Sequence, residues 1–562
     1  MNTVLGTSSA VPRTGDTWTS MWWRHGLGAL LVTGALFWLS MGSGGVFSYP
    51  LDDTYIHMAL ARTLATSGVW GLSPQVPAAA SSSPLWTMLL AANYPLAGML
   101  GQGADLFMPL LWNLAFGVAL VGLNARILKD LPQASWLLFI TWFCTGLPGV
   151  MAVSMEHVAH TFLITWFLYV MARRLGQAGP WVPSGRTLAG LALLTALAAT
   201  ARYESAFVMA PVVWLCVRRR AWRPALVIVV AAAAPLLAVG AVWVHAGGWM
   251  LPNSLLLKGA GSNATTDMWA RFGALASNLV TNLKFPLSWV TFSLLIAHLA
   301  LHMRVKPANE AVRIFSRVAL VSAAAHCLLA SFGWLYRYDA WIVELNLLSI
   351  FMQMPARPCM RWRGRPLSWP ALCVVLLLSR FTGAYVQTTM AMDDRRWEHL
   401  MPSQFVREHL AHRTILVNDV GVFSYDGGAT VVDLFGLGRN EPIRYRQAAS
   451  GYHGPQVKVL ADRLHGEVAI VQLCWDEVNQ RLPQDWRLIG YWRGPRNVVF
   501  GDKIVAVFSV NPGNDALARE ALLASAPYPK VKLFMAGAGD TDAYNQSRAA
   551  QRAAIVNRMC EK

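Results

Sequence analysis

The chain has 562 residues, of which 55% are hydrophobic and only 14% are charged, whereas roughly a quarter of the residues in a soluble domain are charged. Its 25 tryptophans also favour a membrane protein, because tryptophan is enriched at membrane–water interfaces. The formal net charge of +17 would suggest nucleic-acid binding in a soluble chain. Here the arginines stand in short clusters between apolar runs, so we predict a polytopic membrane protein that binds membrane lipid and no nucleic acid.

Long apolar segments fill the first two-thirds of the chain. A helix that spans a bilayer needs about 20 mostly apolar residues, and the first such segment is long enough to be a membrane anchor. No clean small-residue site for signal-peptide cleavage follows it. The predicted membrane segments lie near residues 25–46, 85–101, 106–127, 133–150, 155–172, 187–201, 204–217, 223–246, 283–303, 314–333, 339–355 and 368–386.

The composition changes near residue 387. Charges become frequent there, and short strand-like runs such as RTILVND and EVAIVQLCW alternate with turn signals. We therefore predict an α-helical polytopic membrane core with about 11–13 transmembrane helices over residues 1–386, and a soluble α/β domain over residues 387–562. Cys474 and Cys560 could form a disulfide if this domain lies outside the cytoplasm.

Clusters of basic residues set the predicted orientation, because cytoplasmic loops carry an excess of Lys and Arg. The stretches ARRLGQ, VRRRAWR, HMRVK and ARPCMRWRGRP are expected in the cytoplasm, together with Arg24 near the N-terminus. The first loop, 47–84, and the C-terminal domain are then extracytoplasmic. Counting crossings from the N-terminus conflicts with this assignment. One crossing between residues 85 and 150 must therefore be missed, split or re-entrant, and the total must be odd.

Unusual polar residues stand in the outer connections, next to the ends of apolar helices. Charged groups inside a bilayer are costly and usually mark function, so we predict that these side chains converge on one cavity at the outer membrane surface. They are Asp52, Asp53, His57, Glu156, His157, Arg202, Glu204, Asn253, Lys258, Arg337 and Asp339.

Each of these residues could instead have a purely structural role. Asp52 or Asp53 could simply cap the helix that starts near Thr54. His57 stands four residues after Asp53 on the same helix face, where it could orient the acid or be solvated. The structural roles open to the remaining residues are packing of Glu156 against His157 or His160, an ion pair of Arg202 with Glu204, snorkelling of Lys258 to the interface, and an isolated positive charge at Arg337.

Several stretches between about residue 50 and residue 436 carry a family resemblance. In chain order they are DDTYIHMALARTLATSGVWGLSP, SSSPLW, SMEHVAHTFLITW, ARYESAFV, LPNSLLLKG, RYDAW and NDVGVFSYDGGATVVDLFGL. Together they resemble the bacterial C-type glycosyltransferases, the GT-C superfamily, which use polyprenyl-phosphate-linked sugars. The chain is most similar to the branch of the mycobacterial terminal arabinofuranosyltransferase and its proteobacterial relatives. It departs from the family at Arg202-Tyr203-Glu204, where relatives often read Arg-Pro-Glu, and in the AASSSPLW run, where they often show Thr-Asn-Pro-Leu-Trp.

The resemblance implies a GT-C-like core in the bacterial inner membrane, with its first outer loop over the active site. It also implies inverting transfer of a sugar, arabinofuranose among the candidates, from a polyprenyl-phosphate donor to an extracytoplasmic glycan, lipid or protein acceptor. The base would be Asp53, with Asp52 as the second candidate, since a carboxylate can take the acceptor proton. The predicted substrate-binding residues are Tyr55, His57, Glu156, His157, Arg202, Glu204, Asn253, Lys258, Arg337 and Tyr338.

Cofactors and rival functions remain open at this point. The sequence lacks the GxxxxGK[ST] phosphate loop and a G-x-G-x-x-G motif after a strand, so no nucleotide is implied. Adjacent carboxylates repel, and a divalent metal beside Asp52 and Asp53 is compatible with the sequence, although no third ligand is obvious. We expect the C-terminal domain to cover the cavity or bind the acceptor, with Asp419 and Asp433 as turn or strand-end residues. The rival functions are a transporter or flippase for lipid-linked glycans, a glycan polymerase or ligase, and a membrane scaffold with no chemistry.

Overall fold

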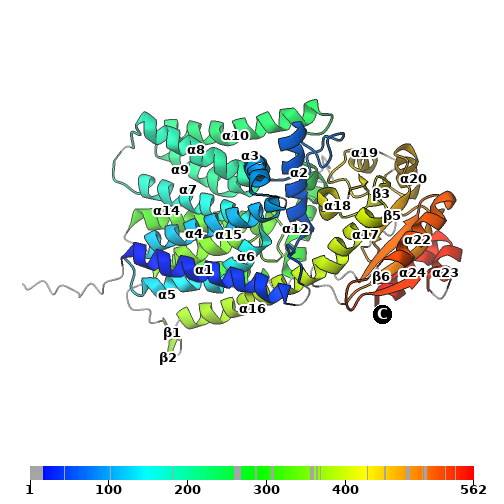
Figure 1. Ribbon diagram of the computed structural model, residues 1–562. Helices are drawn as coiled ribbons and strands as arrows, with labels where there is room; N and C mark the ends of the chain where they lie inside the picture. The colour runs from blue at the N-terminus through cyan, green and yellow to red at the C-terminus, as the bar shows by residue number, and fades with distance from the viewer. Residues whose placement is uncertain are drawn as a thin grey trace, which may run out of the picture.

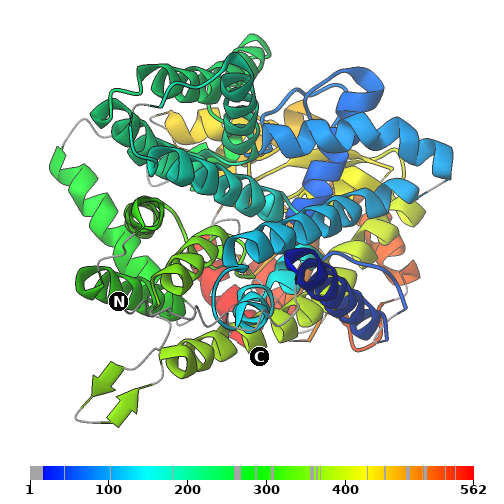
Figure 2. The same ribbon diagram turned by 90° about the vertical axis from the view of Figure 1, so that its left-hand side faces the viewer.

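The structure is a computed structural model that describes residues 17–561, apart from residues 43–44, 102, 180, 259–267, 285–287, 306–308, 334, 355–359, 363–364, 368, 427, 449–450, 476–480, 496–497, 499–502, 526 and 538–539. Long helices lie side by side in one part of the molecule, and a sheet domain packs beyond one end of them (Figure 1). Figure 2 looks at the molecule from the side away from the sheet domain, so this domain lies behind the long helices. The predicted helical core with a C-terminal α/β domain is confirmed.

Every predicted membrane segment coincides with a helix or a broken pair of helices. The unbroken ones are α1 (Trp18–Met41), α3 (Pro84–Leu100), α4 (Met108–Leu128), α7 (His157–Leu175), α8 (Gly185–Ala201), α9 (Ala206–Arg218), α10 (Trp222–His245), α13 (Ser288–Arg304), α14 (Glu310–Leu329), α15 (Ala340–Gln353) and α16 (Trp369–Arg395). The segment predicted at 133–150 is bent by 40° and divides into α5 (Ala134–Phe139), the π-helical turn η2 (Ile140–Cys144) and α6 (Leu147–Val153).

In the part of the chain that the structure describes, three helices are long and apolar enough to cross a membrane alone, or up to five if each of two bent pairs is one span. Shorter apolar helices, α8 and α15, accompany them. Apolar helices of this kind indicate a multi-pass membrane protein, because only about 20 apolar residues are needed to cross the hydrocarbon layer. The total number of crossings stays a prediction.

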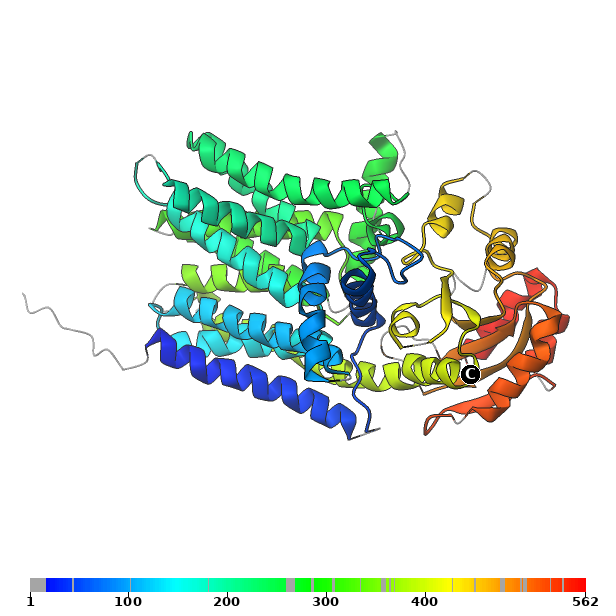
Figure 3. The ribbon, with the colours of Figure 1, turned by 45° about the horizontal axis from the view of Figure 1, so that its top comes forward.

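Two helices near the N-terminus run across the bundle instead of along it. These are α2 (Asp52–Ser67) and α3, which lie at the end of the long helices that faces the sheet domain (Figures 1 and 3). The prediction that 85–101 crosses the membrane is therefore wrong. An apolar run of 17 residues also suits a helix lying in the membrane interface, where exposed side chains such as Leu96 and Met99 can meet lipid. Without this segment the predicted crossings agree in parity with the arginine clusters.

Short elements complete the core. Helices α11 (Asn253–Lys258) and α12 (Met268–Lys284) follow α10, and α12 was not predicted, because its apolar residues occupy only one face. The remaining short elements are the 3₁₀ turns η1 (Ala104–Phe107) and η3 (Tyr203–Ser205) and the hairpin β1 (Met360–Trp362) and β2 (Arg365–Leu367). The predicted boundary at 386/387 falls inside α16, which continues to Arg395 and leads through η4 (Arg396–Leu400) into α17 (Met401–His409).

The C-terminal domain contains a mixed six-stranded sheet in the order β4-β3-β5-β7-β6-β8. Strands β3, β4 and β5 run parallel, and the other pairs are antiparallel. The strands are β3 (Thr414–Val417), β4 (Thr430–Asp433), β5 (Val468–Gln472), β6 (Arg487–Arg493), β7 (Ile504–Ser509) and β8 (Lys532–Met535). The helices of this domain are α18 (Gly421–Asp426), α19 (Glu441–Gln447), α20 (Gly454–Arg463), α22 (Asp515–Ala524), α23 (Asp540–Gln546) and α24 (Ala549–Glu561), with the 3₁₀ turn η5 (Pro512–Asn514) before α22.

Strands β5 and β7 are buried along their whole length, as expected for strands covered on both faces. On one side, Val417 and Ile470 belong to the same apolar cluster as Ile56 and Leu60 of α2. The segment 47–84 and the C-terminal domain therefore share a core, so α2 is held against both parts of the molecule.

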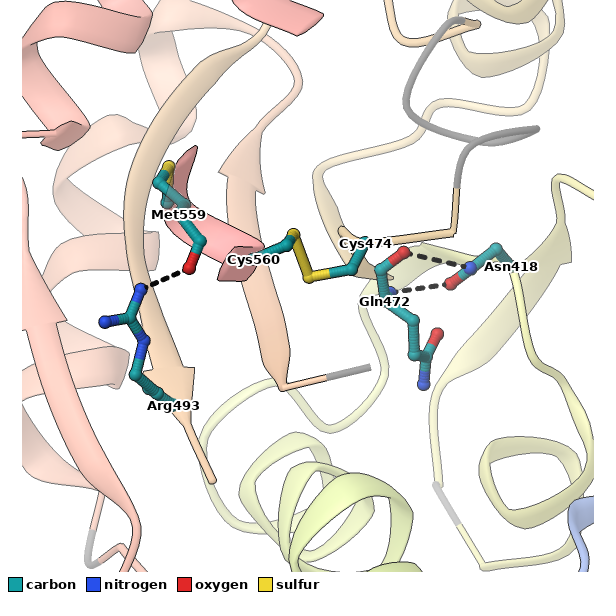
Figure 4. Close-up of a disulfide and its surroundings, with 6 residues drawn as sticks. All are labelled: Asn418, Gln472, Cys474, Arg493, Met559 and Cys560. Carbon is teal, nitrogen blue, oxygen red and sulfur yellow. Dashed lines mark hydrogen bonds between the residues drawn. A yellow bond between two sulfur atoms is a disulfide. The ribbon is translucent and has the colours of Figure 1, made fainter. Parts of the chain in front are cut away.

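A disulfide joins Cys474 to Cys560, with their Cα atoms 5.9 Å apart (Figure 4). It ties the end of β5 to α24, and the predicted pairing is confirmed. Nearby, Gln472 N donates to Asn418 Oδ1 over 3.0 Å, and Arg493 Nη2 donates to the carbonyl of Met559 over 2.6 Å. The first bond fixes the carboxyl ends of β3 and β5 relative to each other, and the second fixes the end of β6 to α24.

Candidate functional site

A cavity of about 650 Å³ lies where α2 meets the ends of the core helices and the loops of the C-terminal domain. Its lining comes from segments that are hundreds of residues apart in the sequence. Most of the predicted site residues line it, namely Asp53, His57, Glu156, His157, Arg202, Glu204, Arg337 and Tyr338. We call these eight residues the cavity cluster.

Arg337 and Asp53 form an ion pair in the cavity wall. Arg337 Nη2 lies 2.5 Å from Asp53 Oδ2 and donates over 3.0 Å to the hydroxyl of Tyr338. The guanidinium is almost completely buried, whereas the Asp53 side chain keeps 27% of its surface exposed. Asp53 is therefore held by a cation at one side while remaining accessible from the cavity.

Arg202 binds two acids at once. Its Nη1 donates to Glu156 Oε1 over 2.6 Å, and its Nη2 donates to Glu204 Oε1 over 2.5 Å. The same Nη1 lies 2.8 Å from His157 Nε2, and the guanidinium lies over the ring of Tyr338. The predicted ion pair of Arg202 with Glu204 is present, and it forms part of the cavity lining.

His57 lies in the second turn of α2. Its Nδ1 is 3.2 Å from Ser81 Oγ, and its Nε2 is 3.4 Å from Glu156 Oε2. Burial lowers the pKa of His57, although the carboxylate of Glu156 opposes the effect, so the imidazole is neutral at neutral pH. His57 therefore contacts Glu156, whereas its spacing in the sequence suggested that it orients Asp53.

The described lining has more acidic than basic groups. It includes the carboxylates of Asp53, Glu156 and Glu204 and the guanidinium groups of Arg202 and Arg337. Two buried atoms, Glu156 Oε2 and His157 Nδ1, make no hydrogen bond within the described chain. Buried polar atoms are nearly always paired, so these two atoms mark the part of the wall where a polar ligand group would be accommodated.

Asp52, the neighbour of Asp53, lies outside this cavity. Its two carboxylate oxygens accept the backbone N–H groups of Gly421 (2.5 Å) and Val422 (2.8 Å) at the start of α18. Gly421 is required there, because a Cβ at this position would collide with the Asp52 carbonyl. The idea that these aspartates cap the helix is wrong, since α2 begins at Asp52 itself and the preceding Leu51 offers no side-chain cap.

Asp52 belongs to a second group, the junction cluster, which consists of Asp52, Arg395, His399 and Asp419. His399 Nε2 is 2.9 Å from Asp419 Oδ2, and Arg395 Nη1 is 3.8 Å from the same oxygen. Burial and the nearby charge of Asp419 raise the pKa of Asp52. Burial also lowers the pKa of His399 to about 4, assisted by Arg395. The expectation that Asp419 is a simple turn residue is thus incomplete.

The two aspartates do not share a metal site. Within the described residues, Asp52, His399 and Asp419 are the group whose possible ligand atoms lie within 4.8 Å of one another, and Asp53 is not part of it. Arg395 supplies a positive charge beside Asp419. A metal bridging Asp52 and Asp53 therefore has no geometric support.

Four other predicted residues are not part of the described cavity lining. The hydroxyl of Tyr55 is buried and accepts the backbone N–H of Tyr49. Asn253 Nδ2 donates to the carbonyls of Gly436 and Leu437, each over 3.2 Å. Asp339 is paired with Arg380, 2.6 Å away. Lys258 ends α11 directly after the cavity-lining Leu257, but its side chain lies outside the described residues.

Other cavity residues were not predicted from the sequence. Phe435, Leu437 and Trp475 come from the C-terminal domain, and Met155 and Tyr203 stand beside predicted residues. The stretch NDVGVFSYDGGATVVDLFGL contains Phe435 and Leu437, so the family resemblance carried a signal for them. Asp433, which precedes them, accepts the backbone N–H groups of Phe435, Gly436 and Gly438, as expected for a turn residue.

Comparisons with known proteins give a limited result. A domain of unknown function (DUF8728) matches residues 389–508, which include η4, α17 and strands β3 to β7. No curated protein matches the chain. The matched residues are far less than half of the chain and lie mostly in the C-terminal domain, so they do not show a family for the whole chain.

Several solved structures are similar to this chain, and three of them follow. One is the archaeal oligosaccharyltransferase AglB from Archaeoglobus fulgidus, in complex with an inhibitory peptide and a dolichol-phosphate, at 9% identity and TM-score 0.46 over 85% of this chain and 74% of that one. Another is the Archaeoglobus fulgidus oligosaccharyltransferase in the apo form, at 10% identity and TM-score 0.45 over 86% and 74%. The third is the arabinofuranosyltransferase AftD from Mycobacteria, at 14% identity and TM-score 0.45 over 86% and 41%. All three TM-scores are below 0.5, and all three identities are below 25%.

Proposed function

We propose that the protein is an integral-membrane glycosyltransferase of the GT-C type. It transfers a sugar, arabinofuranose among the candidates, from a polyprenyl-phosphate donor to an extracytoplasmic glycan, lipid or protein acceptor at the bacterial inner membrane. The observation that carries this proposal is the convergence of eight predicted residues, drawn from distant stretches of sequence, on the lining of one cavity.

Asp53 is the proposed catalytic base. It takes the proton of the acceptor hydroxyl as that oxygen attacks the anomeric carbon, the bond from this carbon to the phosphate oxygen breaks, and polyprenyl phosphate leaves. A positioned acid–base group contributes about 10²–10⁴ in rate. The ion pair with Arg337 holds the carboxylate toward the cavity, and single displacement inverts the anomeric centre.

The donor phosphate requires cations, which stabilise the charge on the leaving group. Arg337 and Arg202 are the described candidates, but both are already paired with carboxylates. The described lining contains three carboxylates against two guanidinium groups, so a dianionic or monoanionic phosphate needs a further cation. We assign this role to Lys258, which follows the cavity-lining Leu257 in the chain.

Transfer from radiolabelled decaprenyl-phosphate arabinose in membranes tests the proposal. Asp53→Asn is expected to lower covalent transfer at least about 100-fold at matched protein level. Asp130→Asn, a surface control whose side chain is 85% exposed, is expected to transfer at the wild-type rate. Wild-type transfer by the Asp53 variant would remove Asp53 as the base, and movement of the label across the membrane without transfer would support a flippase instead.

The cation assignment has its own test. Lys258→Ala and Arg337→Gln are expected to raise the donor concentration needed for half-maximal transfer, because each removes a positive charge that attracts phosphate. Donor saturation identical to that of the wild type would exclude these residues from the phosphate site. Deletion of residues 400–562 without loss of transfer would likewise contradict a role for the C-terminal domain in covering the cavity or binding the acceptor.

A further inference from the structure

The parallel half of the sheet presents one edge to the helical core. Strands β3, β4 and β5 are parallel neighbours, so their carboxyl ends lie at the same edge, where α/β proteins usually bind ligands. The segment after β3 holds Asp52 through Gly421 and Val422. The segments after β4 and β5 bring Phe435, Leu437 and Trp475 to the cavity.

The loop after β4 is fixed from both sides. Asp433 accepts three backbone N–H groups within the loop at 2.6–2.9 Å. From the core, Asn253 Nδ2 donates to the carbonyls of Gly436 and Leu437. Gly438 packs so closely on Leu72 of the first outer loop that a Cβ would collide with it. Phe435 and Leu437 are thus held in place by contacts with both parts of the molecule.

The segment after β5 is fixed by the disulfide. Cys474 is bonded to Cys560 in α24 (Figure 4), and Trp475 is the next residue. The rings of Trp475 and Phe435 have centroids 4.8 Å apart at an interplanar angle of 35°, and the guanidinium of Arg446 lies 4.9 Å from the centre of the Phe435 ring. Two aromatic rings from two loops therefore form a single supported surface in the cavity wall.

The position of this surface points to a polar acceptor rather than to the lipid tail. The C-terminal domain lies beyond the ends of the long helices (Figures 1 and 3), so its loops reach the cavity from the side away from the apolar bundle. The face of a sugar ring presents C–H groups, which are attracted to the electron-rich face of an aromatic ring. The hydroxyls of the sugar can meet polar groups of the lining, such as Glu156 Oε2, which makes no hydrogen bond in the described chain.

We propose that Trp475, supported from behind by the buried Phe435, forms the carbohydrate subsite of the acceptor, in which the indole ring packs against the face of a sugar next to the reacting hydroxyl. This inference rests on the proposed function, because it names the acceptor as a glycan or glycoside instead of an unglycosylated lipid or protein. Leu437 completes the apolar wall of the subsite, and the disulfide keeps Trp475 at its place.

Binding of soluble glycosides to the purified full-length protein tests the subsite. The probes are methyl α-D-arabinofuranoside and methyl α-D-mannopyranoside, followed by saturation-transfer NMR in lipid nanodiscs, with decaprenyl phosphate binding as the second measurement. We expect the wild type to bind at least one glycoside. Trp475→Leu should weaken that binding about tenfold or more, and Trp475→Phe, which keeps an aromatic ring, should stay within about threefold. Decaprenyl phosphate binding should be unchanged in both variants.

Trp136→Ala, which removes a lipid-facing tryptophan that is 66% exposed, serves as the control and should bind like the wild type. Three results would overturn the subsite. They are wild-type protein that binds neither glycoside, equal glycoside binding by the wild type and Trp475→Leu, and weakened decaprenyl phosphate binding with intact glycoside binding. Glycoside binding that depends on Trp475 in a protein without transferase activity would leave the subsite standing and reject the proposed reaction.

Discussion

The cavity cluster and the junction cluster begin at adjacent residues of α2, yet their chemistry differs. Asp53 in the cavity cluster is bound by one arginine and stays 27% exposed. Asp52 in the junction cluster is 3% exposed, and both of its oxygens accept backbone N–H groups. Successive helical residues point about 100° apart, so one carboxylate faces the cavity and the other faces the C-terminal domain.

Asp53 and Asp52 show how the surroundings of a reactive acid differ from those of a structural one. In the junction cluster, Asp419, His399 and Arg395 pair with one another and with the sheet domain, and the group links two parts of the fold. In the cavity cluster, Glu156 and His157 line the cavity and Asp53 keeps 27% of its side-chain surface exposed. A site that turns over must leave some interactions for its substrate, because binding energy is useful when it is gained in the transition state.

Removal of Arg202 is the largest expected perturbation of the cavity cluster. Arg202→Met leaves Glu156 buried without its cation, and the loss of one partner of a buried ion pair costs about 3–5 kcal/mol. We expect a large fall in the thermal stability of the detergent-purified protein and no measurable transfer. Arg219→Met breaks the more exposed pair with Glu310 and should cost about 0–1 kcal/mol. Equal effects of the two substitutions would mean that the cavity cluster is solvated.

The next largest effects are expected from substitutions of the two neighbouring aspartates, Asp52 and Asp53, which should differ in their effect on transfer. Asp52→Ala leaves the N–H groups of Gly421 and Val422 without their acceptor, which should lower the free energy of unfolding by about 1–3 kcal/mol. Transfer per folded molecule should stay within a few-fold of the wild-type rate. Asp53→Asn keeps a hydrogen-bond acceptor for Arg337 but leaves this buried guanidinium without its carboxylate. It should therefore lose transfer per folded molecule and also lower the stability. Denaturant titration and transfer assays on the same preparations would measure both. Loss of transfer in correctly folded Asp52→Ala protein would contradict the distinction between a structural Asp52 and a reactive Asp53.

Much of the fold could be predicted from the sequence, because apolar runs define helices locally. The direction of a helix is not local, which is why the segment of α3 was taken for a crossing although it lies across the bundle (Figure 3). Helix α12 escaped prediction because only one of its faces is apolar. The Cys474–Cys560 pair could be proposed from composition, but its geometry depends on residues 86 positions apart.

The candidate site was predictable where charge was the signal. Glu156, Arg202 and Arg337 stood out because acids and bases are rare at the ends of apolar helices. Phe435 and Trp475 gave no comparable signal, since aromatic residues beside strands usually belong to a core. Asp52 could not be separated from Asp53, because its partner Gly421 is 369 residues away and only the folded chain shows which carboxylate that glycine binds.

The pH dependence of stability should sharpen the description of the junction cluster, with the smallest expected effect. The pKa of His399 falls to about 4 in the folded protein, whereas an unfolded histidine titrates near about 6.5. As the pH falls from about 6.5 toward 4 the unfolded chain binds a proton that the folded one does not, so stability decreases. Asp52 acts oppositely, since its raised pKa gives stability that is present at low pH and lost as the pH rises through the folded value.

His399→Asn isolates the histidine contribution, because the asparagine keeps a hydrogen-bonding group beside Asp419 but does not titrate. Between pH 7 and pH 5 we expect the wild type to lose about 2 kcal/mol more than the variant, measured by denaturant unfolding of the full-length protein. His409→Asn, on the partly exposed end of α17, provides the control and should follow the wild-type curve. If the free energy of unfolding depended on pH in the same way in the wild type and in His399→Asn, His399 would not be buried among charges. The junction cluster would then be as open as the cavity cluster.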